Sequence, residues 1–153
     1  MKGDRLPGDA HVLRYIQRRC IENRDGVPDI QGTAFWSRPR DDNMTSFNWM
    51  ERFGGTHDEK VNEIRSRARL QYKAKGLLAK LNVGSVMQIL DERLNGQSLS
   101  HFIEDPLEAE PPHHLEDPSH TLMTHMPAEG ELLVEAIGDI LAECVLDHYP
   151  AKL

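Results

Sequence analysis

The chain has 153 residues, the size of one ordinary domain and too short for two large ones, and its 39% hydrophobic and 28% charged residues are close to globular averages. It has no run of about 18 uncharged apolar residues and no apolar stretch behind its first basic residue, so we expect a cytoplasmic protein without a membrane span or secretory leader. The net charge of −7 is unevenly divided, because residues 1–100 hold 17 of the 18 Lys and Arg and 13 of the 25 acids, whereas residues 101–153 hold one Lys and 12 acids.

Residues 1–55 are expected to be mainly β-structure. The sequence HVLRYI at 11–16 has the β-branched and aromatic residues of a strand. Residues 32–38 and 45–53 are predicted to pair as a hairpin across Asp41, Asp42 and Asn43, since Pro39 ends the first strand. The alternation in 45–53 places three aromatic residues on one face, and we expect them in the main core: Phe47, Trp49 and Phe53.

Residues 56–103 are expected to be mainly helical. Thr56 and Glu59 form a capping box that predicts a helix from Asp58 to near Gly76. A second helix is predicted from Ser85 to Leu94, and residues 99–103 could form a short strand. Three basic residues step by four along one side of the first helix: Arg65, Arg69 and Lys73.

Residues 104–130 contain five prolines and many acids without apolar periodicity, which predicts a long loop. Asp117 before Pro118 could begin one short helix inside it. Residues 131–148 are predicted to form an amphipathic C-terminal helix. Beside its apolar face, acids recur every four residues: Glu131, Glu135, Asp139, Glu143 and Asp147. Like charges at this spacing repel each other, which favours a basic surface opposite them.

Together these elements predict one α+β domain over residues 1–153. It would have a small N-terminal antiparallel sheet with a hairpin, central helices, a Pro-rich acidic loop and a C-terminal helix that packs back on the body. The two cysteines, Cys20 and Cys144, are expected to be reduced.

The long loop also holds the candidate catalytic residues, since four of the eight histidines fall within residues 111–125. Histidine, acid and hydroxyl side chains suited to hydrolysis lie close together there: His114, Asp117, Ser119 and His120. The patterns GxSxG and HExxH and the phosphate-binding glycine motifs are all missing from the sequence. We therefore expect no tightly bound metal and no cofactor.

Three functional hypotheses remain open from the sequence. The first is a non-enzymatic interaction or accessory module, which would bind another protein or a second copy of itself through Arg65, Arg69, Lys73 and the acidic helix. The second is a small hydrolase-type enzyme that uses His and Asp residues of 113–125, with or without a metal. The third is nucleic-acid binding through the basic helix near 65–80, which the acidic C-terminal third disfavours.

Overall fold

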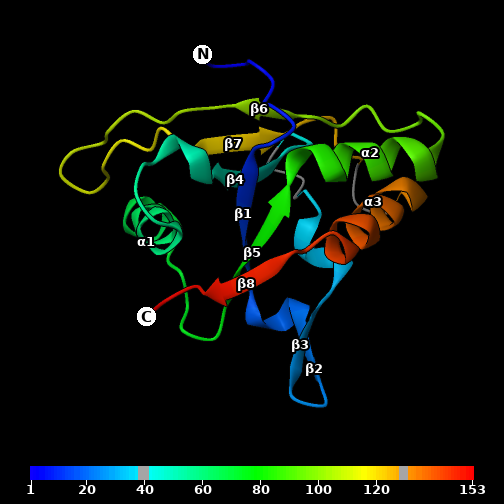
Figure 1. Ribbon diagram of the computed structural model, residues 1–153, viewed down its shortest axis with the longest axis horizontal. Coiled ribbons are helices and arrows are strands. Elements are labelled where there is room, and N and C mark those ends of the chain that lie inside the picture. The colour runs from blue at the N-terminus through cyan, green and yellow to red at the C-terminus, as the bar shows by residue number, and fades with distance from the viewer. Residues whose placement is uncertain (38–41, 128–130) are drawn as a thin grey trace.

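In the computed structural model, which describes residues 1–37, 42–127 and 131–153, the chain forms an α+β fold around a six-stranded antiparallel sheet (Figure 1). The strand order is β6-β7-β4-β1-β5-β8, and the strands are β1 (His11–Ile16), β4 (Thr45–Trp49), β5 (Leu77–Asn82), β6 (Phe102–Glu104), β7 (His120–Met123) and β8 (Asp147–Pro150). The predicted fold class is confirmed. The sheet nevertheless takes strands from the whole chain, not only from its N-terminal third.

The central strands β1 and β5 pair over six residues, from His11 opposite Asn82 to Ile16 opposite Leu77. The strand predicted at 11–16 is therefore confirmed, whereas β5 was not predicted. Val12 and Ile16 of β1 pack into a larger core on one face of the sheet, and Leu13 packs into a smaller core on the other. Both faces of the sheet are thus covered.

The larger core lies beneath α2 (Val83–Leu94), α3 (Leu132–Glu143) and the 3-10 helix η2 (Gly32–Phe35). Both predicted helices are present. The α2 cap is Asn82 instead of Ser85, since the Asn82 side chain accepts from the Ser85 amide. The predicted extent of the C-terminal helix, residues 131–148, is wrong, because α3 ends at Glu143 and residues 147–150 form β8 at the edge of the sheet. Gly138 lets α3 approach η2 closely, because a Cβ there would lie 2.6 Å from the Gly32 carbonyl oxygen.

The smaller core lies beneath α1 (His57–Arg67), whose Val61 and Ile64 are buried. Thr56 is confirmed as the N-cap of this helix, since its hydroxyl accepts from the Glu59 amide at 3.2 Å. The reciprocal half of the capping box differs from the prediction, because the Glu59 carboxylate accepts from the Thr56 hydroxyl at 3.2 Å. The predicted length is wrong, because the helix ends at Arg67 and Ala68 has extended dihedral angles. The chain then runs irregularly to β5, so Arg69 and Lys73 do not continue a helical stripe.

The predicted hairpin between 32–38 and 45–53 is also wrong. Residues 32–35 form η2 against α3, and β4 pairs with β1 and β7. Part of the predicted hairpin, residues 38–41 with the end of its first strand and the start of its turn, lies outside the described residues. Phe47 is buried in the larger core and Trp49 packs partly against it, whereas Phe53 joins the smaller core because η4 (Met50–Arg52) interrupts the alternation.

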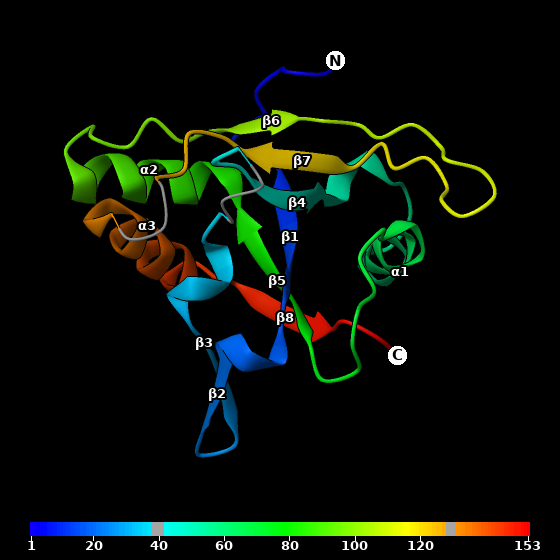
Figure 2. The same ribbon diagram turned by 180° about the vertical axis from the view of Figure 1, so that it is seen from behind.

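The chain does contain a hairpin, formed by β2 (Ile21–Arg24) and β3 (Val27–Ile30) after the 3-10 helix η1 (Arg18–Cys20). Asp25 and Gly26 connect the strands with φ angles of +53° and +80°, the left-handed backbone that an Asp-Gly turn favours. The hairpin projects away from the body of the molecule (Figures 1 and 2).

The segment predicted as a loop at 104–130 contributes β7 to the sheet, between β4 and β6. Before β7, residues 105–119 leave the sheet and return to it, and we call this segment the 105–119 excursion. Two isolated β-bridges pair its outgoing and returning parts: Leu107–Asp117 and Glu110–His114. The short helix predicted at Asp117 is therefore wrong, since Asp117 lies in a bridge. Among the described residues, no helix has the length and apolarity needed to cross a membrane.

Candidate functional site

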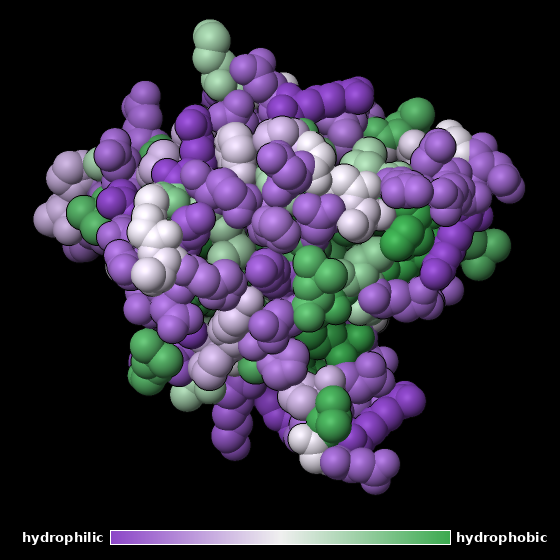
Figure 3. Space-filling model, viewed as in Figure 1, coloured by the Kyte–Doolittle hydropathy of each residue, from purple (hydrophilic) through white to green (hydrophobic). Residues whose placement is uncertain are grey.

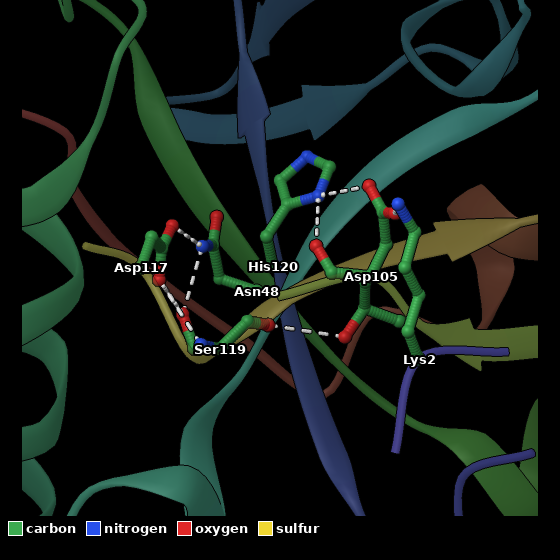
Figure 4. A network of polar contacts seen from close by, with 7 residues as sticks. Lys2, Asn48, Asp105, Asp117, Ser119 and His120 are labelled. Atoms are coloured by element: carbon green, nitrogen blue, oxygen red, sulfur yellow. Dashed lines mark hydrogen bonds and ion pairs between the residues drawn. The ribbon is translucent and has the colours of Figure 1, made fainter. Parts of the chain in front are cut away.

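Three of the four catalytic candidates come together where the 105–119 excursion enters β7. Asp117 and Ser119 contact Asn48 of β4, and His120 lies directly opposite Asn48 in the sheet (Figure 4). His114 lies apart, in the bridge to Glu110 near the tip of the excursion. Pairing between β4 and β7 therefore assembles a polar cluster that sequence adjacency alone could not specify.

Asp117 is the buried anchor of this cluster, with only 3% of its surface exposed. Its Oδ1 accepts from the Ser119 hydroxyl at 2.6 Å and from the Ser119 amide at 3.1 Å, and its Oδ2 accepts from the Asn48 side-chain amide at 2.9 Å. The Asn48 amide also donates to the Ser119 hydroxyl at 2.9 Å. These donors satisfy the buried carboxylate, which would otherwise be costly to desolvate.

His120 is oriented by Asp105, the residue whose amide donates to the His120 carbonyl. The His120 Nδ1 lies 3.0 Å from the Asp105 Oδ2 and 3.1 Å from the Asp105 carbonyl oxygen. Both neighbours are acceptors, so Nδ1 carries a proton, and in a neutral ring Nε2 is left with a lone pair. Lys2 lies 3.7 Å from the other oxygen of Asp105 and completes the cluster in Figure 4.

A cavity of about 320 Å³ opens beside these residues, which we call the Arg14–His120 cavity. Beside the cavity, β1 and β4 pair over only two residues, up to Leu13 opposite Asn48. Past Leu13, the Arg14 guanidinium of β1 donates to the Ser46 carbonyl of β4 and to the Ala34 carbonyl of η2. The polar residues that line the cavity include Arg14, Tyr15, Thr45, Ser46, Asn48, Arg69, Tyr72, Asp117 and His120.

Tyr72 forms part of the cavity wall and stacks on Tyr15 with 4.6 Å between ring centroids. Burial raises the pKa of Tyr72 to about 12, and the nearby negative charge of Asp117 adds to this rise. The Tyr72 hydroxyl therefore stays protonated at neutral pH and can donate a hydrogen bond. Apolar residues, among them Leu13, Trp36 and Leu107, complete the wall.

The predicted partner-binding basic residues are dispersed. Arg65 donates to the Pro150 carbonyl. Arg69 instead turns toward the excursion, where its guanidinium lies 3.2 Å from the Glu110 carboxylate. It also donates to two backbone carbonyls there, those of Glu108 and Leu115. The Arg69 Nε is buried without a partner among the described residues. Lys73 remains exposed beside Tyr15. These residues therefore do not form one face toward α3.

The acidic residues predicted for partner binding do lie along the solvent side of α3. Glu131 precedes the helix, Glu135, Asp139 and Glu143 lie within it, and Asp147 belongs to β8; all are exposed. Glu143 forms an ion pair with Arg93 of α2. Within the described part of the chain, the other four have no ion pair.

Sequence reasoning missed three residues of the site: Arg14, Asn48 and Tyr72. Arg14 carried one usable signal, since it is a charged residue inside an otherwise apolar strand sequence. Asn48 carried none, because the pairing of β4 with β7 alone brings it to His120. Asp105 is one of several acids near the histidines in the sequence, and only the structure selects it as the partner of His120.

Within residues 1–37, 42–127 and 131–153, no three His, Cys, Asp or Glu side chains gather closely enough to hold a metal ion. Both cysteines are free thiols. No protein-family model, curated protein or solved structure matches this chain.

Proposed function

We propose that this chain binds a small polar ligand in the Arg14–His120 cavity and that His120 acts there as a general base. The observation that carries the proposal is the pairing of His120 Nδ1 with Asp105, which leaves Nε2 as a proton acceptor in a residue that lines the cavity. A base held in this way needs no reorganisation before it accepts a proton. The hydrolase-type hypothesis thereby gains a definite set of residues.

The wall of the cavity suits a ligand with both donor and acceptor groups. Arg14 and Arg69 contribute positive charge, Asp117 contributes negative charge, and Tyr72 contributes a hydroxyl donor. The buried Arg69 Nε, which has no partner in the described part of the protein, could be satisfied by an acceptor atom of the ligand. The apolar wall would bury the remainder of the molecule.

Ser119 is not suited to be the nucleophile of such a reaction. Its side chain is fully buried, and its hydroxyl proton is donated to Asp117. Asp117 and Ser119 instead have a structural role, since their hydrogen bonds to Asn48 fix the junction between β4 and β7. If the reaction is a hydrolysis, the nucleophile is a water molecule deprotonated by His120 Nε2, and the proton passes from that nitrogen to the leaving group.

Two measurements test this proposal. First, carboxylate- and phosphate-bearing fragments are titrated into the isotope-labelled protein, and we expect the largest amide shifts at Arg14, Asn48 and His120. Second, hydrolysis of p-nitrophenyl acetate and bis(p-nitrophenyl) phosphate is measured in wild type, His120→Asn and His114→Asn.

We expect His120→Asn to lower any hydrolysis rate by about 100-fold or more, the usual contribution of a general base. His114→Asn is the matched control, since His114 lies on the same excursion but does not line the cavity. Equal rates in both variants would refute the role of His120. Fragment shifts confined to other surfaces would refute the binding site itself.

A protein-interaction role remains the second candidate, and one observation favours it. Hydrophobic residues gather beside α3 and β8 (Figure 3). The same helix carries Glu135 and Asp139, which have no ion pair within the described part of the chain. Leu146, which joins α3 to β8, is 58% exposed, and Val27 at the hairpin is 63% exposed. An apolar patch rimmed by charge is typical of a partner-binding surface.

A further inference from the structure

A pair of histidines at the other end of β7 is independent of the Arg14–His120 cavity. His101 precedes β6 and His125 follows β7, and their ring centroids lie 5.4 Å apart with a 33° tilt. We propose that His101 and His125 form a binding site for an exchangeable transition-metal ion that prefers imidazole, such as Zn²⁺ or Cu²⁺.

The first support is the protonation pattern of the two rings. The His101 Nδ1 lies 3.2 Å from the Leu99 carbonyl oxygen, so this nitrogen is a donor. The His125 Nδ1 lies 3.0 Å from the Thr124 hydroxyl oxygen, and that hydroxyl already donates its proton to the His101 carbonyl. The His125 Nδ1 is therefore also a donor, and both neutral rings keep a lone pair on Nε2.

This pattern is the one that metal-binding histidines show in proteins. A histidine ligand usually donates its other ring N–H to a carbonyl, carboxylate or hydroxyl, which fixes the ring and its tautomer before the metal arrives. Two imidazoles on one tetrahedral zinc, with Zn–N bonds of about 2.1 Å, place their centroids about 5 Å apart. The separation of His101 and His125 matches this value.

The second support is the backbone that brings the rings together. The Thr124 amide donates to the His101 carbonyl, so Thr124 and His101 are opposite neighbours, and regular alternation would send the His125 side chain to the other face. His125 instead has a φ of +54°, a left-handed conformation that is uncommon for residues other than glycine. Ser100 holds it in place by donating to the His125 carbonyl at 3.1 Å. Such backbone outliers cluster at functional sites.

The remaining coordination positions would be filled by water, because no third protein ligand joins the pair among the described residues. The site is therefore expected to bind reversibly, through neutral nitrogen donors that suit zinc, copper and nickel better than magnesium or calcium. This agrees with the expectation that the chain has no tightly bound metal. The inference does not depend on the proposed reaction at His120.

The test is a titration of the metal-free full chain with Zn²⁺ by calorimetry, and with substoichiometric Cu²⁺ by NMR. We expect one Zn²⁺ per chain, and selective Cu²⁺ broadening of the signals from His101 and His125. His125→Asn and His101→Asn should each weaken Zn²⁺ binding at least tenfold. Asn is the suitable replacement at 125 because it tolerates the left-handed backbone.

Two further variants separate a metal site from a structural contact. Thr124→Val removes the acceptor for the His125 Nδ1 proton and should weaken Zn²⁺ binding about tenfold, as loss of such an outer partner usually does. The double variant His113→Asn/His114→Asn removes two other histidines, which lie on the 105–119 excursion, and should leave binding unchanged.

Zn²⁺ binding that survives either His101→Asn or His125→Asn would overturn the proposal. It would also be overturned by a wild-type protein that binds no Zn²⁺, or by copper broadening that starts at His113 and His114. The NMR measurement on the wild type needs no variant, so it decides the question even if a substitution disturbs folding.

Discussion

At the scale of single residues, Asp117 is the group whose loss should be most costly in the site. Asp117→Ala would leave buried donors of Asn48 and Ser119 without their acceptor. We expect the free energy of unfolding, measured by chemical denaturation, to fall by about 3 kcal/mol, the cost of breaking a buried charge-assisted network. Glu116→Ala is the matched control, since Glu116 is exposed and lends only its carbonyl to a hydrogen bond; an equal loss there would contradict this account.

Tyr72 should make stability depend on pH at the alkaline end. Its pKa is about 12 in the folded protein and about 10 in an unfolded chain, so the folded state keeps a proton that the unfolded state has released. The contribution of Tyr72 is full below pH about 10 and is lost as pH rises toward about 12. Denaturation of wild type and Tyr72→Phe should show a steeper decline in the wild type over this interval. Parallel curves would show that Tyr72 is not the cause.

At the scale of elements, the contact of α3 with η2 depends on Gly138. In an exposed helix, Gly→Ala stabilises by about 1 kcal/mol. Here the added methyl would meet the Gly32 carbonyl oxygen at 2.6 Å and the Trp36 ring nitrogen at 2.7 Å, so one element must shift. We expect Gly138→Ala to lower the melting temperature, with a net loss of about 1–3 kcal/mol. Gly54→Ala is the control and should change the melting temperature little, since nothing lies within 4 Å of the new methyl. A Gly138→Ala protein as stable as the wild type would contradict the close contact between α3 and η2.

At the scale of the whole molecule, charge is separated between two surfaces. The acidic surface is on α3, where Glu135 and Asp139 have no ion pair within the described part of the chain. The basic surface lies near the ends of β1 and β5, and its residues likewise have no ion pair among the described residues: Arg19, Lys73 and Lys75. If a second copy joins these surfaces, the double variant Glu135→Lys/Asp139→Lys should abolish self-association, and salt should weaken self-association of the wild type. Sedimentation across a range of salt concentrations measures this.

The control for that experiment is Glu108→Lys/Glu116→Lys, which makes the same change in net charge on the exposed excursion. It should self-associate like the wild type. A wild-type mass of one 17.4 kDa chain at every salt concentration would rule out self-association and leave only a different partner protein for the acidic surface.

Local signals in the sequence determined those elements whose stabilising contacts are close along the chain. The N-cap at Thr56, the apolar periodicity of α3 and the β-branched run of β1 each act within a few residues, and the structure has all three. The Asp25-Gly26 turn carried an equally local signal, although the strands β2 and β3 on either side of it were not predicted. The proximity of Asp117, Ser119 and His120 was also visible in the sequence, because they are neighbours in it.

Only the tertiary structure decided what depends on contacts between distant segments. Residues 32–35 have the composition of a strand, yet they form η2 because burial against α3 outweighs that preference. The α1 helix ends at Arg67 although its periodicity continues, and Arg69 then turns to the excursion, 41 residues away at Glu110. Asn48 and Asp105 reach His120 only through strand pairing across 72 and 15 positions of the chain. Partners so far apart leave no periodic trace in a single sequence, because their register is set by the packing of the whole sheet.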